Sequence, residues 1–142
     1  MSTKRGLIVS ALDTALKTIT VANGYRTDLY ESVIPRFIFP DEDPQLPVIS
    51  FTAGQENIVY QTGGFQDRYL QLQIRAYVDD PDGTGSPIEN LIKDIEELVE
   101  TNSRLALSDG TTVRDIKVTL IDTDQGVLAP LGLAEIQLVV EY

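Results

Sequence analysis

The chain has 142 residues, of which 42 % are hydrophobic, and this size and composition are typical of one globular domain. It contains neither cysteine nor histidine, which excludes disulfides, thiolate metal sites and the commonest catalytic base. Its net charge of −11 disfavours binding to nucleic acids and to anionic membranes, because both present phosphate groups.

An amphipathic helix is predicted over residues 3–20. Ser2 or Thr3 can cap its start, and Asn23-Gly24 supplies a left-handed stop. The apolar residues recur at helical spacing and form one stripe. They are Ile8, Leu12, Ala15, Leu16 and Ile19.

Extended segments are predicted next. Residues 31–39 carry Pro35, which points to an edge strand or a bulge. The proline- and acid-rich stretch 40–47 is predicted to be an exposed loop. A buried strand over 48–53 and a weaker extended segment over 58–60 follow.

The clearest strand is predicted over residues 67–78, because apolar and polar residues alternate strictly. Its inward face carries Leu70, Leu72, Ile74, Ala76 and Val78, and its outward face carries Tyr69, Gln71, Gln73, Arg75 and Tyr77. The outward face has two interpretations. It is either a solvated sheet face or a protein interface, where Tyr and Arg are enriched.

A second helix is predicted after the loop at 79–85. Ser86 is expected to cap it, Pro87 fits the first turn and Glu89 completes a capping box. Asn102 is expected to close it. The buried stripe comprises Ile88, Leu91, Ile92, Ile95, Leu98 and Val99, whereas Asp94, Glu96, Glu97 and Glu100 are predicted to face water.

Strands dominate the last third of the chain. Residues 105–107 and 111–113 flank a Ser-Asp-Gly turn and predict a hairpin. Two further strands are predicted around 116–120 and 134–142. The apolar connection between them, 122–133, either packs over the core edge or is buried in a partner.

The order helix, three strands, helix, three strands predicts an α+β fold. We expect a mixed, mostly antiparallel sheet with both helices packed on one face, and a single domain over residues 1–142.

One stretch suggests metal chemistry. Asp80, Asp82, Gly83 and Glu89 match positions of a calcium-binding EF-hand loop, but Val78 occupies the first ligand position. A polar turn followed by a helix cap explains the same residues. No cofactor, no catalytic residue and no metal ligand is therefore predicted, and an enzyme is not expected.

Several short motifs follow one another along the chain. The first helix leads into NGYRTDL at 23–29, then ESVIPRF at 31–37 and LPVISF at 46–51. The strand FQDRYLQLQIRAYV at 65–78 and the terminal GLAEIQLVVEY at 132–142 complete the series. In this order they resemble the tail terminator (tail completion) proteins of long-tailed bacteriophages.

The resemblance implies a structural protein. Such proteins form a homo-hexameric ring that caps the head-proximal end of the tail tube, stops its polymerisation and provides the surface for head attachment. The implied partners are copies of itself, the tail tube protein and a head-completion or neck protein, with no membrane. DNA passes through the lumen without specific binding, and the implied location is the virion neck after assembly in the host cytoplasm. Another neck ring subunit and a calcium- or small-ligand-binding module stay open as alternatives.

The candidate interface residues are Arg26, Tyr69, Arg75, Tyr77, Val127, Leu128 and Leu131. Arg26 is either an exposed surface charge or half of an ion pair between subunits. Beside it, Thr27 or Asp28 is expected to cap a local turn, and Tyr25 to pack against the end of the first helix.

Overall fold

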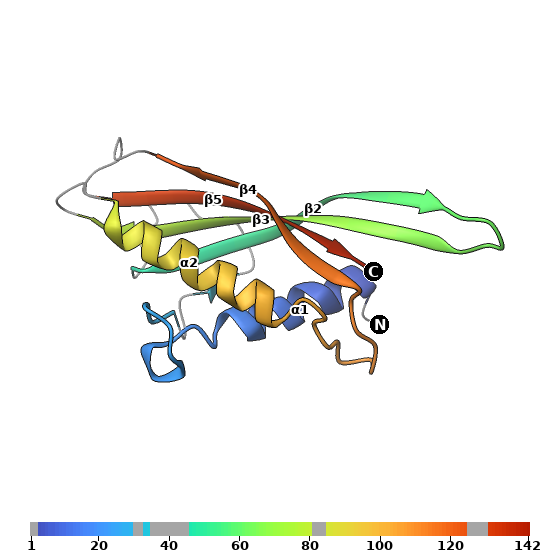
Figure 1. Cartoon of the computed structure of the whole chain (residues 1–142), viewed down its shortest axis with the longest axis horizontal. Helices are drawn as coiled ribbons and strands as arrows, with labels where there is room; N and C mark the ends of the chain where they lie inside the picture. The colour runs from blue at the N-terminus through green and yellow to red at the C-terminus, as the bar shows by residue number, and fades with distance from the viewer. Residues whose placement is uncertain (1–2, 30–32, 35–45, 81–84, 125–130) are drawn as a thin grey trace.

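Two helices lie on one face of a β-sheet (Figure 1). The structure, a computed structural model, describes residues 3–29, 33–34, 46–80, 85–124 and 131–142. The α-helices are α1 (Lys4–Leu16) and α2 (Ser86–Thr101). The predicted α+β class is confirmed, and neither of these helices is long and apolar enough to cross a membrane.

The sheet has five strands in the order β1-β2-β3-β5-β4. They are β1 (Val33–Ile34), β2 (Val48–Tyr60), β3 (Gln66–Asp79), β4 (Asp115–Thr123) and β5 (Leu131–Glu141). Only β1 and β2 pair in parallel, so the sheet is mixed and mostly antiparallel as predicted. The predicted hairpin before β4 forms, but it joins through the single bridge Ala106↔Thr112 and lies outside the sheet.

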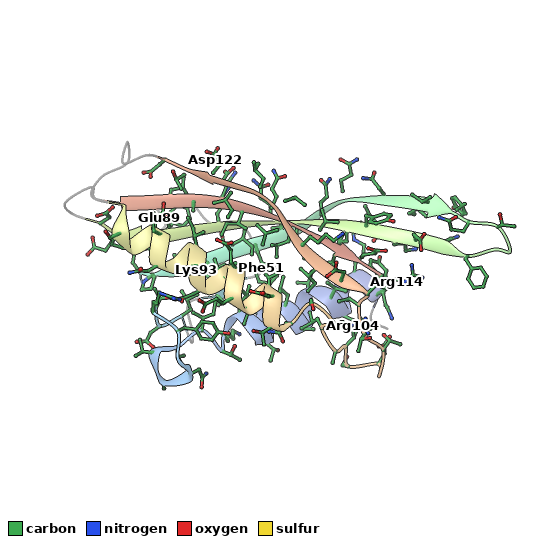
Figure 2. The ribbon with its side chains drawn as sticks, viewed as in Figure 1. Phe51, Glu89, Lys93, Arg104, Arg114 and Asp122 are labelled. Atoms are coloured by element: carbon green, nitrogen blue, oxygen red, sulfur yellow. The ribbon has the colours of Figure 1, made fainter. Side chains whose placement is uncertain are left out.

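The core lies between the helices and the sheet. All the residues predicted for the stripes of both helices and for the inward face of β3 are buried. Phe51 of β2 is fully buried in the same cluster, and Figure 2 shows it between the sheet and α2. The periodicity of the sequence therefore predicted this core correctly.

The first helix is shorter than predicted. Thr3 caps it by accepting the N–H of Gly6 at 3.1 Å, but the helix ends at Leu16 instead of residue 20. The next residues, 18–21, are all β-branched, and the hydroxyl of Thr18 donates to the carbonyl of Ala15. Gly24, with φ of +91°, ends the short 3₁₀-helix η1 (Val21–Asn23) and not α1.

The start of α2 also differs from the prediction. Gly85, with φ of +79°, occupies the N-cap, and Ser86 is the first helical residue. The backbone N–H of Gly85 donates to the carboxylate of Asp80 at 2.8 Å, which orders the approach to the helix. Asn102 closes α2 as predicted, since its backbone and side-chain N–H groups both donate to the carbonyl of Leu98.

Strands β2 and β3 extend past the helices as a projecting hairpin (Figure 1). The two extended segments predicted at 48–53 and 58–60 are one strand, with a bulge between Ala53 and Glu56. We call residues 57–69 the arm. Gly63 and Gly64 have φ of +87° and +84°, a conformation that favours glycine, and they form the turn at its tip.

Candidate assembly surfaces

The stretch that resembles a calcium-binding loop, residues 80–89, leads into α2 and forms its first turn. Asp80 is buried and its carboxylate accepts the N–H of Gly85, the N-cap residue of α2, whereas 81–84 lie outside the described residues. Among the residues that the structure describes, no three His, Cys, Asp or Glu side chains are grouped to hold a metal ion.

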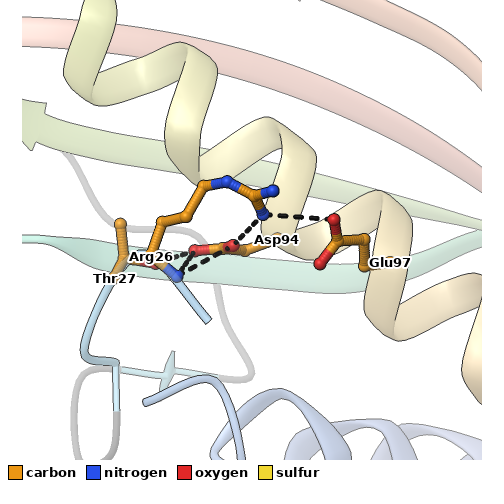
Figure 3. A network of polar contacts seen from close by, with 4 residues as sticks. All are labelled: Arg26, Thr27, Asp94 and Glu97. Atoms are coloured by element: carbon orange, nitrogen blue, oxygen red, sulfur yellow. Dashed lines mark hydrogen bonds and ion pairs between the residues drawn. The ribbon is translucent and has the colours of Figure 1, made fainter. Parts of the chain in front are cut away.

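Arg26 belongs to a polar cluster between residues 25–28 and α2 (Figure 3). Its backbone N–H donates to both carboxylate oxygens of Asp94, at 3.1 and 3.0 Å. Its Nη1 lies 3.1 Å from an oxygen of Asp94 and 3.1 Å from an oxygen of Glu97. The hydroxyl of Thr27 donates to Asp94 at 2.6 Å.

Asp94 was expected to face water, and this prediction is wrong: the residue is 0 % exposed. Residues 25–28 cover it and supply hydrogen bonds to both carboxylate oxygens, which is what a buried carboxylate requires. The guanidinium of Arg26 is thus engaged within its own chain while remaining partly exposed.

Of the predictions for the neighbours of Arg26, the one for Asp28 is confirmed, whereas the packing of Tyr25 against the end of the first helix stays a prediction. Asp28 accepts the N–H of Val21 at 2.7 Å and so holds the local turn. Tyr25 packs against the main core, and burial, together with the charges of Glu97 and Asp94, raises the pKa of its phenol.

The second candidate surface is the sheet face opposite the helices. Neither helix covers it, and Asp122 of β4 points away from them (Figure 2). Tyr69 and Arg75 lie on this face, in the alternation predicted for β3. Arg75 pairs with Glu135 of β5 at 3.2 Å, and Gln73 donates to the same carboxylate at 3.3 Å.

Tyr77 lies on the same face, but the prediction of an exposed ring is wrong. It is 3 % exposed, because it packs against Val48 and partly buried apolar neighbours that include Leu133. For Leu133 the structure therefore shows packing within the chain.

The remaining interface predictions concern the connection to β5. Val127 and Leu128 lie outside the described residues. Leu131 is the first residue of β5 and pairs with Asp79, and its side chain is likewise outside the description. The structure thus places Tyr69, Arg75 and Tyr77 at intervals along one face of β3, and Arg26 in the helix layer.

The exposed arm was missed by the sequence analysis. It carries Ile58, Val59, Tyr60 and Phe65 as exposed large hydrophobic residues, with Tyr60 73 % and Phe65 69 % exposed. A signal was present, because residues 57–66 contain no charged side chain although the chain is strongly acidic, and they include a Gly-Gly pair.

The base of the arm is held by a charged cluster. Glu56 pairs with Arg68 at 2.7 Å and accepts a hydrogen bond from the hydroxyl of Tyr142. Burial alone would raise the pKa of Glu56, but these two hydrogen bonds outweigh it and hold the pKa below its ordinary value. Burial and the bond to Glu56 raise the pKa of Tyr142 to about 12.

Together these features define a small acidic α+β protein with an uncovered polar sheet face and a projecting apolar hairpin. Its sequence matches the family described as bacteriophage tail tube terminator protein over residues 2–142, and the chain belongs to this family. The resemblance noted from the short motifs is confirmed. This is a family of structural phage tail proteins and not of enzymes.

Individual relatives agree with this assignment. The tail tube terminator protein p142 of Escherichia phage T5 is 30 % identical over 126 residues, which cover 83 % of this chain and 78 % of that protein. A chain from the virion of a native gene transfer agent particle shares the fold, with a TM-score of 0.62 at 11 % identity. That alignment covers 99 % of this chain and 98 % of the other.

Proposed function

We propose that this chain acts as one domain, residues 1–142, in a homo-hexameric ring that terminates a phage tail tube. The ring caps the head-proximal end of the tube, stops its polymerisation and presents the surface to which the head joins. The observation that carries the proposal is the family match over residues 2–142, supported by the 30 % identity to the T5 terminator.

The partners follow from this position. They are neighbouring copies of the chain, the tail tube protein and a head-completion or neck protein, in the neck of a virion assembled in the host cytoplasm. DNA passes through the ring without specific binding. The net charge of −11 supports this, because an acidic lumen offers few cations to replace the counterions of DNA.

The candidate interface residues keep their proposed role where the structure leaves them accessible. Tyr69 and Arg75 lie on the sheet face that no helix covers, which supports a subunit or tube contact there. Arg26 is proposed as a contact of secondary importance, since its charge is already paired with Asp94 and Glu97. Val127, Leu128 and Leu131 remain proposals from the sequence alone.

Two measurements test the proposal. Light scattering of the purified chain is expected to give a mass above that of a dimer of the 15.7 kDa subunit. Deletion of the gene is expected to give tails of abnormal length that do not join heads. A monomer at high concentration together with normal tails contradicts the proposal, and tails of normal length that fail to join heads assign the chain to another ring of the neck.

A further inference from the structure

The arm exposes apolar side chains in a way that calls for a partner. This one hairpin carries four of the large hydrophobic residues that are exposed in the described structure. They are Ile58, Val59, Tyr60 and Phe65. Single exposed apolar residues are ordinary, whereas four on one short hairpin, two of them aromatic, indicate a contact site.

The arm is also rigidly built. At its tip the backbone N–H of Gln61 donates to the carbonyl of Phe65 at 2.7 Å, and its side chain donates to Asp67 at 2.9 Å. At its base Glu56 binds Arg68 and Tyr142. The ladder between β2 and β3 is continuous from the bulge to the tip, and the arm projects past its own helices. It is therefore preorganised to bind a surface outside its own fold.

A groove on the helix side of the molecule offers a matching surface. It has a volume of about 500 Å³ and lies between α1 and residues 102–108. That volume is within the range of about 300–1,000 Å³ typical of ligand pockets. Small and apolar side chains line it, among them Leu7, Ser10, Ala11, Thr14, Ala106 and Leu107.

Charge favours a second copy of this chain as the occupant. Two copies that each carry −11 repel one another, and a contact between surfaces without charge adds nothing to that repulsion. Residues 57–66 of the arm are uncharged, and so is every residue that lines the groove. A basic partner would instead favour the acidic parts of the surface.

We propose that the arm tip of one copy, with Tyr60 and Phe65, lies in the groove between α1 and residues 102–108 of the next copy. Such a contact joins two different surfaces, and repeating it around an axis generates a ring when the rotation between neighbours closes. Each aromatic side chain can bury about 150–250 Å² there. The inference rests on the proposed function, because it supplies the subunit contact of the proposed ring.

Engineered disulfides test the contact directly, since the chain has no cysteine of its own. We expect the double variant Phe65→Cys, Ala106→Cys to form a ladder of disulfide-linked multimers on mild oxidation, because both residues are exposed. A mixture of the two single variants should give linked dimers, and each single variant alone should give neither. Absence of the ladder overturns the proposal.

Light scattering on the unsubstituted chain, run beside the cysteine variants, separates this failure from failure of the ring. If the unsubstituted chain forms ring-sized particles while the double variant gives no ladder, the contact lies elsewhere and the proposed function stands. If the unsubstituted chain is a monomer, the ring itself is wrong.

A second experiment measures the apolar contribution of the tip. We expect the double variant Tyr60→Ser, Phe65→Ser to remain folded by circular dichroism and to lose assembly. Val21→Ser is the matched control, because Val21 is 57 % exposed and lies outside both surfaces. A tip variant that still forms rings but no longer caps purified tubes overturns the proposal and assigns the arm to the tube protein.

Discussion

At the residue scale, Asp94 joins the segment after α1 to α2 through one buried carboxylate. We expect Asp94→Ala to lower the free energy of unfolding by about 3 kcal/mol, since it leaves the N–H of Arg26 and the hydroxyl of Thr27 without their acceptor. Arg26→Ala should lower the free energy of unfolding by less than Asp94→Ala, because its partly exposed ion pair is screened by water.

Urea denaturation of both variants checks this order, with Glu100→Ala as an exposed control on the same helix. Equal losses for Asp94→Ala and Arg26→Ala would mean that the ion pair, and not the hydrogen bonds to the backbone, determines the contribution of Asp94.

Tyr142 gives the second prediction at this scale, a loss of stability in alkali. Its pKa is raised from 10.0 to about 12 in the folded chain, so its contribution is complete below pH 10 and is lost as the pH rises toward 12. We expect the wild type to be more stable than Tyr142→Phe at pH 8 and this difference to shrink between pH 10 and 12. Denaturant titrations at several pH values measure it, and a constant difference contradicts the assignment.

At the element scale, the packing of β5 against β3 and α2 depends on Gly132. A Cβ atom at this position would come within 2.7 Å of a methyl of Val78 and 3.6 Å of Ile88. We expect Gly132→Ala to destabilise the fold by about 1–3 kcal/mol, as overpacking does. Adding Val78→Ala should relieve the clash. Gly132→Ala should therefore lower the stability less in a chain that already carries Val78→Ala than in the wild type.

Gly54→Ala is the matched control in β2. A Cβ atom there would lie 3.7 Å from the carbonyl oxygen of Gln71, which is an ordinary contact. Thermal unfolding of the four variants measures these effects. If Gly132→Ala lowers the stability no more than Gly54→Ala does, the close approach of β5 to Val78 is not a constraint on the fold.

The elements also show what a sequence can predict. The stripe of α2 and the alternation of β3 were predicted correctly, because local periodicity determines which face is buried. The burial of Asp94 was not predicted, since its partner Arg26 is 68 residues away in the chain and only the fold brings them together. Gly24 was assigned to the wrong helix, because a stop signal does not say which of two successive helices it ends.

The arm shows the same limit for the candidate site. Apolar and polar residues alternate along β3 in the same way where helices cover the sheet and where they do not. Periodicity alone therefore does not reveal where the sheet projects beyond the core. The exposure of Tyr60 and Phe65 depends on the length of the helices relative to the strands, which is a property of the assembled fold.

At the scale of the whole molecule, charge and assembly are coupled. Copies that carry −11 each repel one another, and the Debye length of about 10 Å at 0.1 M salt falls to about 3 Å at 1 M. An uncharged contact between arm and groove loses nothing to this screening, so added salt removes repulsion only. We therefore expect sodium chloride to shift the chain toward the ring.

Sedimentation or light scattering at fixed protein concentration, from low salt to 1 M, measures this shift. Tyr60→Ser, Phe65→Ser serves as the control and should stay monomeric throughout, which excludes salting-out of the whole surface as the cause. Dissociation of the wild-type ring at high salt would contradict the prediction, because it would show that ion pairs between copies, and not uncharged surfaces, hold the subunits together.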